Sequence, residues 1–181
     1  MSIFDRLRTI FNKPASGETQ ASSTPVPSAQ VERRRIPRHN PKAGTRVLII
    51  DDSPTVIFAF KKILQSSGMV LLEALDAEKG IIIAREQKPD LIFLDIVLPG
   101  MNGFAALRAM RRDPLTQAIP IIMISSNEQA TEQFFGSKIG ADDFLKKPFT
   151  RPEVFNHIAN LLDAQGIPRR IAEQPEGAAK A

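Results

Sequence analysis

Short apolar runs alternate with helical stretches from Arg46 onward, and this alternation is the strongest constraint on the fold of the chain. The runs predict strands at about residues 46–51, 70–74, 90–95, 120–125 and 143–146. The stretches between them predict helices at about 54–66, 76–87, 103–111 and 128–139, with a last helix near 151–163. Pro54 suits an early helical position and Gly68 suits a helix end. Strands that alternate with helices through short connections indicate a doubly wound α/β fold with a parallel sheet.

Polar side chains capable of chemistry stand where four of the predicted strands end. Asp51 and Asp52 follow the first apolar run, and Asp95 closes the third. Ser125 closes the fourth run, and Lys147 follows the fifth. In an open parallel sheet the carboxyl ends of the strands meet at one edge, and ligands bind where the strand order reverses. Three carboxylates, a hydroxyl and an ammonium group at that edge predict a site for a divalent cation and a phosphoryl group.

Composition excludes several other classes of protein. The 181 residues are enough for one ordinary domain with tails, and 43% of them are hydrophobic, which suffices for a packed core. The absence of Cys excludes disulfides and thiolate chemistry, and no apolar run approaches the length of about 18 residues that spans a bilayer. We therefore expect a cytoplasmic protein.

The basic charge of the chain is concentrated in its amino-terminal part. Residues 1–46 hold nine basic and three acidic residues, whereas the remainder is slightly acidic. The high pI therefore belongs to an extension and does not by itself indicate nucleic-acid binding. An adaptor that binds nucleic acid through this basic segment stays an alternative function, but nucleic acid is the disfavoured partner because no aromatic residues are interleaved with the arginines.

The domain organisation follows from these patterns. Residues 1–14 predict a short amphipathic helix with its body at 2–13, and residues 15–45 predict a disordered, basic, Ser/Pro-rich linker. Residues 46–164 form the predicted domain, and residues 165–181 a flexible tail. Two readings of the first helix stay open. It is either a disordered tail or a docking helix for a partner protein or an anionic membrane surface.

Four motifs connect this pattern with a known family. VLIIDDSPT, LIFLDIVLPGMNG, PIIMISS and DFLKKPF occur in this order, each at a predicted strand end. With them, residues 45–163 resemble the receiver domain of bacterial two-component response regulators, particularly the stand-alone type of chemotaxis and twitching motility. The resemblance implies a flavodoxin-like doubly wound sheet of five parallel strands with five helices. It also implies a phosphorelay protein that takes phosphate from a histidine kinase, and not an enzyme beyond catalysing its own phosphotransfer and dephosphorylation.

The resemblance assigns a role to each residue of the acidic edge. Asp95 would be the phosphoacceptor, and Lys147 would neutralise charge on the transferred group. Mg²⁺ prefers oxygen ligands and commonly takes one or two carboxylates with waters. Asp52 and Asp95 would bind Mg²⁺ directly, and Asp51 would orient a bound water. The backbone carbonyl of Val97 would be the remaining ligand from the protein. A cis bond between Lys147 and the following proline would aim the ammonium group into the site.

The resemblance also implies how phosphorylation would change the conformation of the domain. The Ser125 hydroxyl would donate to the phosphoryl group, and Phe144 would turn into the space that this movement vacates. The target-binding face would then consist of residues 128–139, 143–146 and 151–163. Because no output domain is expected after residue 164, the output would be a protein contact or a phosphate passed onward, so a phosphotransfer sink or relay intermediary stays an alternative.

Two further residues carry expectations. Val97, two positions after Asp95, is apolar and cannot help to orient a hydrolytic water, so we expect slow self-dephosphorylation. His157 lies on the last predicted helix, away from the acidic edge, and is assigned no role.

Overall fold

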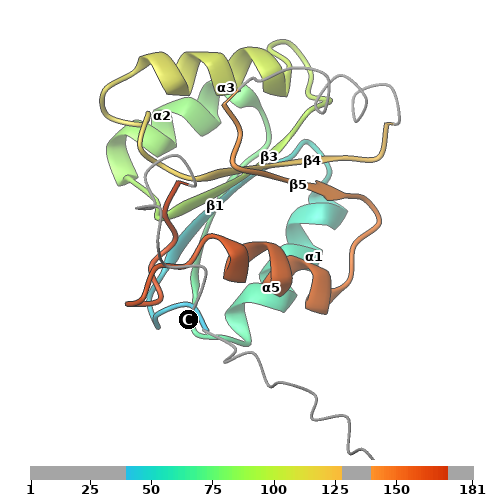
Figure 1. Ribbon diagram of the computed structural model, residues 1–181. Coiled ribbons are helices and arrows are strands. Elements are labelled where there is room, and N and C mark those ends of the chain that lie inside the picture. Colours follow the sequence, from blue (N-terminus) through green and yellow to red (C-terminus); the bar gives the residue numbers. More distant parts are fainter. Residues whose placement is uncertain (1–39, 128–139, 171–181) are drawn as a thin grey trace, which may run out of the picture. The chain divides into compact units, whose positions relative to one another are not determined.

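The computed structural model describes residues 40–127 and 140–170 of the chain. Its centre is one sheet of parallel strands in the order β2-β1-β3-β4-β5 (Figure 1). The strands are β1 (Arg46–Ile50), β2 (Val70–Ala74), β3 (Leu91–Asp95), β4 (Ile121–Ser125) and β5 (Asp143–Lys146). The described helices are α1 (Pro54–Gln65), α2 (Ala77–Gln87), α3 (Gly103–Arg112) and α5 (Arg151–Asn160). The predicted doubly wound parallel sheet is confirmed, with every strand end within one residue of its predicted position.

Several predicted segments lie outside the described residues. They are the amphipathic helix over 2–13, most of the linker over 15–45, the helix over 128–139 and the last part of the tail. Among the helices of residues 40–127 and 140–170, none combines the length and the apolar character that crossing a bilayer requires.

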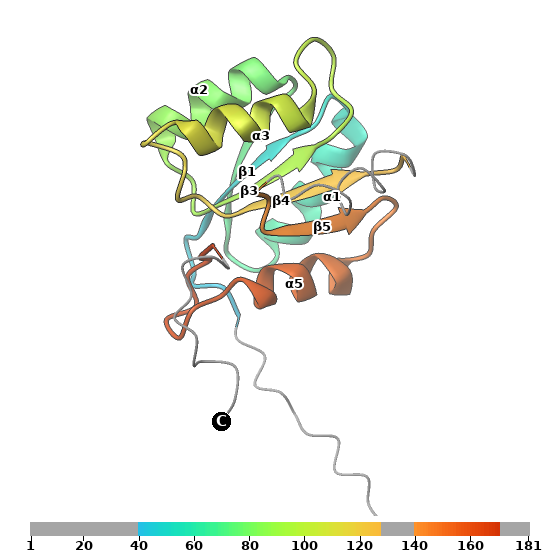
Figure 2. The same ribbon diagram turned by 45° about the horizontal axis from the view of Figure 1, so that its top comes forward.

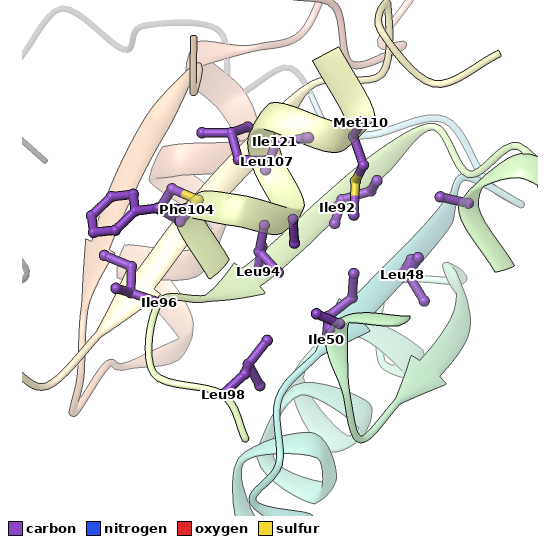
Figure 3. Close-up of a cluster of buried hydrophobic side chains, with 14 of the residues drawn as sticks. Leu48, Ile50, Ile92, Leu94, Ile96, Leu98, Phe104, Leu107, Met110 and Ile121 are labelled. Carbon is purple, nitrogen blue, oxygen red and sulfur yellow. The ribbon is translucent and has the colours of Figure 1, made fainter. Parts of the chain in front are cut away.

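Two helical layers enclose the sheet. Helices α2 and α3 cover one face, and α1 and α5 cover the other (Figures 1 and 2). The side chains of the strands alternate between two buried clusters, one under each layer. Figure 3 shows the first cluster, in which Leu48, Ile92 and Leu94 of the sheet pack against Leu107 and Met110 of α3.

Burial along the strands follows their position in the sheet. The three central strands β1, β3 and β4 are buried on both faces over almost their whole length, which explains their continuous apolar sequences. The edge strands β2 and β5 have exposed positions. Asp95 ends the central strand β3, and Asp51 directly follows the central strand β1. Both carboxyl groups are therefore placed by the most deeply buried part of the sheet.

Local signals fix the turns around this edge. The Asn102 side chain accepts a hydrogen bond from the Ala105 N–H at 2.9 Å and caps α3. A Cβ atom added at Gly103 would lie 2.1 Å from the carbonyl oxygen of Asp95, so the start of α3 lies directly against the end of β3. Gly68 has a φ of 72°, as expected for the end of α1.

The prediction of a last helix reaching residue 163 is wrong. Helix α5 ends at Asn160, and the chain then turns back on itself, because the Arg169 N–H donates to the Leu161 carbonyl at 2.7 Å. Leu162 and Pro168 form an antiparallel bridge across this turn. Residues 165–170 were predicted as part of a flexible tail, but the structure shows them bonded to the domain.

Candidate functional site

The strand order places the acidic residues together. Strand β1 connects to β2 on one side and the chain continues on the other side with β3, so the order reverses between β1 and β3. Asp51 and Asp52 follow β1, and Asp95 ends β3. The carboxylate oxygens that Asp51, Asp52 and Asp95 can offer lie within 4.8 Å of one another. The three predicted carboxylates thus form one cluster at the switch point of the sheet.

Lys147 reaches into this cluster. Its Nζ lies 2.6 Å from Oδ2 of Asp51 and 2.6 Å from Oδ2 of Asp95, while its side chain is only 15% exposed. The peptide bond from Lys147 to Pro148 is cis, as the resemblance implies. The Lys147 N–H donates to the Ser125 carbonyl at 2.8 Å, which fixes the backbone that carries the ammonium group.

The second oxygen of each buried carboxylate is held by the loop that follows its strand. Oδ1 of Asp51 accepts from the Ser53 N–H at 3.0 Å, and Oδ1 of Asp95 accepts from the Val97 N–H at 3.2 Å. Each aspartate therefore uses one oxygen to shape its loop and points the other at Lys147. The side chain of Val97 is 55% exposed beside this loop, and the role of its carbonyl stays a prediction.

Burial and charge shape the electrostatics of the site. Asp51 and Asp95 are buried, whereas Asp52 is exposed. Burial raises the pKa of Asp51 above its usual value, although the Lys147 ammonium and the Ser53 N–H act in the opposite direction. Burial lowers the pKa of Lys147, but its hydrogen bonds to Asp51 and Asp95 outweigh this effect and the pKa is raised. Lys147 therefore stays charged between the carboxyl groups of Asp51 and Asp95.

This donor set fits a hard divalent cation. Oδ2 of Asp51 is buried and, apart from its ion pair with Lys147, has no hydrogen-bond partner within residues 40–127 and 140–170. Asp52 offers an exposed carboxylate beside it. Oxygen ligands with an open, solvent-facing side suit Mg²⁺, which keeps several of its waters. Asp51, Asp52 and Asp95 are the residues that would hold it.

Ser125 lies next to the cluster at the end of β4. It is buried, and it pairs in register with Lys146, the residue before Lys147. Its Oγ accepts a hydrogen bond from the Asn127 N–H at 3.0 Å. The hydroxyl is thus engaged with its own loop, one strand away from Asp95.

Phe144 is already inside the domain. It is 9% exposed and belongs to the same buried cluster as Ile96 and Phe104. The resemblance assigns this inward position to the phosphorylated state. Rotation of Phe144 can therefore report phosphorylation only if the unphosphorylated protein also populates an outward position.

Sequence reasoning missed one polar pair on the predicted target face. His157 Nδ1 lies 2.6 Å from Oδ2 of Asp143, and Oδ1 of Asp143 accepts from the Phe144 N–H at 2.8 Å. The hydrogen bond to Asp143 raises the pKa of His157 above its usual value. No local pattern could reveal this contact, because it joins a strand and a helix 14 positions apart.

Comparison with known proteins gives consistent matches. The family model described as the response regulator receiver domain matches residues 47–159. Protein PilH of Pseudomonas aeruginosa is 42% identical over 117 residues, which are 65% of this chain and 97% of PilH. The phosphate regulon transcriptional regulatory protein PhoB of the same species is 34% identical over 68% of this chain, but the match spans only 54% of PhoB.

Solved structures show the same architecture. The chemotaxis protein CheY4 of Vibrio cholerae is 27% identical, with a TM-score of 0.61 over 66% of this chain and all of CheY4. The receiver domain of the sensor histidine kinase PA1611 of Pseudomonas aeruginosa is 28% identical, with a TM-score of 0.59 over 65% of this chain and 96% of that domain. That structure holds a magnesium ion in its active site cleft.

Proposed function

Because this chain belongs to the family of response regulator receiver domains, which act in phosphorylation-dependent signalling, we propose that it accepts a phosphoryl group on Asp95 and thereby switches a protein-binding surface. One observation carries the proposal. Asp95 directs one carboxylate oxygen at the Lys147 ammonium, 2.6 Å away, within a cluster of three carboxyl groups. A nucleophile, a cation for the transferred group and a donor set for a metal ion are thereby present in one site.

The chemistry is a transfer between two residues. An oxygen of the Asp95 carboxylate attacks phosphorus, and the bond from phosphorus to the nitrogen of the donor histidine breaks, which leaves an aspartyl-phosphate. Such a transfer depends mostly on positioning and on neutralising the charge of the phosphoryl oxygens. Lys147 provides positive charge, and its backbone bond to Ser125 holds it in place.

Magnesium is the proposed cofactor, and it would neutralise charge on the carboxylates and the phosphoryl oxygens. Three observations support it: the oxygen cluster, the buried Asp51 oxygen that only Lys147 partners among the described residues, and the magnesium ion in the PA1611 receiver domain. The protein itself orients the carboxylate ligands. The hydrogen bonds that Asp51 and Asp95 accept from the backbone of the following loops fix the rotation of both carboxylates.

The readout is proposed to start at Ser125. A phosphoryl group on Asp95 adds nearly two negative charges and strong acceptor oxygens. The Ser125 hydroxyl can donate to one of them when the end of β4 moves toward Asp95 and changes the Asn127 loop. Because β4 and β5 pair over four positions, this movement reaches β5 and the face that includes residues 143–146.

The partners follow from the same proposal. A histidine kinase in the cytoplasm would supply the phosphoryl group, and a protein target would bind the face formed by residues 128–139, 143–146 and 151–163. Of these ranges, 128–139 lies outside the described residues. Helix 2–13 is proposed as an additional contact with a partner or a membrane surface, and it also lies outside them.

Titration with beryllofluoride and Mg²⁺ tests the proposal, because this complex imitates a phosphoryl group on a carboxylate. The chain contains no Trp or Tyr, so calorimetry or NMR is the suitable readout. We expect saturable, Mg²⁺-dependent binding by the wild type and none by Asp95→Ala. Equal binding by Asp95→Ala would refute the assignment of the phosphoacceptor.

A pull-down with both forms then separates a switch from a phosphotransfer sink. A switch predicts a partner that is retained only with beryllofluoride or only without it. A sink predicts no such partner and loss of phosphate to a second histidine-containing protein.

A further inference from the structure

Residues 161–170 form a short element that we call the carboxyl-terminal clasp. It begins directly after α5, and it lies beyond residues 47–159, which the receiver family model matches. The Leu162–Pro168 bridge and the bond from Arg169 N–H to the Leu161 carbonyl close it. Pro168 is buried, so the clasp packs onto the domain.

The clasp is attached at two places far apart in the sequence. The Gly166 carbonyl accepts from the Lys42 N–H at 2.9 Å, which ties the clasp to the segment that leads into β1. A Cβ atom added at Gly166 would lie 3.0 Å from the Asn40 carbonyl oxygen, and its φ is 74°, so the close approach requires glycine. At its other end, Arg170 reaches the segment that leads into β5.

Arg170 contacts the same three residues as Arg111 of α3, namely Gln117, Gly140 and Asp142. Arg170 Nε lies 3.2 Å from Oδ1 of Asp142, and a terminal nitrogen of Arg111 lies 2.8 Å from Oδ2. Both guanidinium groups also donate to the carbonyl oxygens of Gln117 and Gly140. The Asp142 side chain is 2% exposed, so these charge-assisted bonds form largely out of water.

Asp142 in turn fixes the beginning of β4. Its Oδ2 accepts from the Ile121 N–H at 2.8 Å, and its own N–H donates to the Ile121 carbonyl at 2.9 Å. Asp142 therefore joins β4 to β5 in both directions at the amino ends of the strands. The two arginines connect this junction to α3 and to the clasp.

We propose that the clasp is a latch that favours the observed position of β4, in which Ser125 bonds to Asn127 rather than to a phosphoryl group. The inference rests on the function proposed above, because that function requires β4, together with its paired strand β5, to move relative to α3 and the clasp. Such a movement strains bonds that meet at Asp142, and Arg170 contributes to them from the clasp. Removing Arg170 lowers this cost, so the phosphorylated arrangement becomes easier to reach.

The test compares Arg170→Gln with Arg169→Gln, which removes the same charge from the neighbouring position. Arg169 is a suitable control because its side chain is 55% exposed and pairs with Asp163 within the clasp. Beryllofluoride affinity at saturating Mg²⁺ is the readout. We expect Arg170→Gln to bind beryllofluoride roughly three- to tenfold more tightly than the wild type. The bonds of Arg170 are weakened, not lost, in the phosphorylated arrangement, so only part of the energy of a charged hydrogen bond separates it from the observed one. Arg169→Gln should bind within about twofold of the wild type, because an exposed pair contributes little.

Gly166→Ala is a second variant that loosens the clasp without touching Arg170. It should also tighten binding, and it decides the question if Arg170→Gln does not fold. Unchanged or weaker beryllofluoride affinity in a folded clasp variant would overturn the latch, even if its melting temperature fell. Failure of the wild type to bind beryllofluoride would instead overturn the proposed function.

Discussion

The substitution Lys147→Gln should expose how strongly the acidic cluster depends on one cation. It removes the ammonium group 2.6 Å from both Asp51 and Asp95 and leaves their carboxyl groups without that partner. Breaking a buried ion pair by removing one member costs about 3–5 kcal/mol. Because Lys147 is 15% exposed, we expect the lower end, about 3 kcal/mol in the absence of metal. For a domain of this size that corresponds to a fall in melting temperature of roughly 12 °C.

Magnesium should restore much of this loss. A divalent cation bound by the three carboxylates supplies the positive charge that the variant lacks, so Mg²⁺ should stabilise Lys147→Gln more than the wild type. The loss should also shrink at low pH, because burial already raises the pKa of Asp51 and the unpaired carboxyl group can take up a proton.

Thermal unfolding followed by circular dichroism, with a chelator and with saturating Mg²⁺, measures both effects. Lys62→Gln on the exposed side of α1 is the charge-matched control and should change the melting temperature little. A fall of less than about 3 °C in Lys147→Gln, or equal stabilisation of both proteins by Mg²⁺, would refute the electrostatic account of the site.

Three further predictions follow from individual positions. Gly103→Ala should cost roughly 3 kcal/mol and weaken beryllofluoride binding, because its Cβ would lie 2.1 Å from the Asp95 carbonyl oxygen. In Gly80→Ala the nearest atoms to the new Cβ belong to the Ile50 side chain rather than to the backbone, so this variant should destabilise the fold while leaving the beryllofluoride affinity unchanged. Equal affinities in both variants would count against a role of the α3 start in positioning Asp95. The pKa of His157 is raised above its ordinary value of 6.5 by its hydrogen bond to Asp143 on β5. The stability that this ion pair adds should therefore be complete below pH 6.5 and disappear as the pH rises through the pKa of His157 in the folded protein. Denaturant unfolding against pH should show this slope in the wild type and lose it in His157→Gln. Val97→Asn should hydrolyse its aspartyl-phosphate faster than the wild type, and decay of the wild-type phosphate within seconds in a phosphate-release assay would contradict the slow rate predicted for Val97.

Much of the fold could be predicted because its determinants are local. The strands β1, β3 and β4 are buried on both faces, so their sequences are unbroken apolar runs that end at polar residues. The parallel arrangement then determines which ends meet, and the cluster of Asp51, Asp52 and Asp95 follows from it. The direction of Lys147 was implied by the family resemblance, since spacing alone does not aim a side chain.

The clasp could not be predicted, because its determinants are distant in the sequence. Residues 161–170 mix apolar and charged residues with Gly166 and Pro168 and lack any periodicity, which is the usual mark of a loop or a flexible tail. Their order depends on acceptors at Gln117, Gly140 and Asp142, together with the amide of Lys42. The inward position of Phe144 also depends on tertiary packing rather than on local sequence.

The most direct measurement is the mass of the protein after incubation with acetyl phosphate and Mg²⁺. We predict a gain of about 80 Da, located by peptide analysis to the segment that contains Asp95 and absent from Asp95→Asn. An unmodified wild-type protein, or the same gain in Asp95→Asn, would contradict the assignment of this carboxylate as the phosphoacceptor.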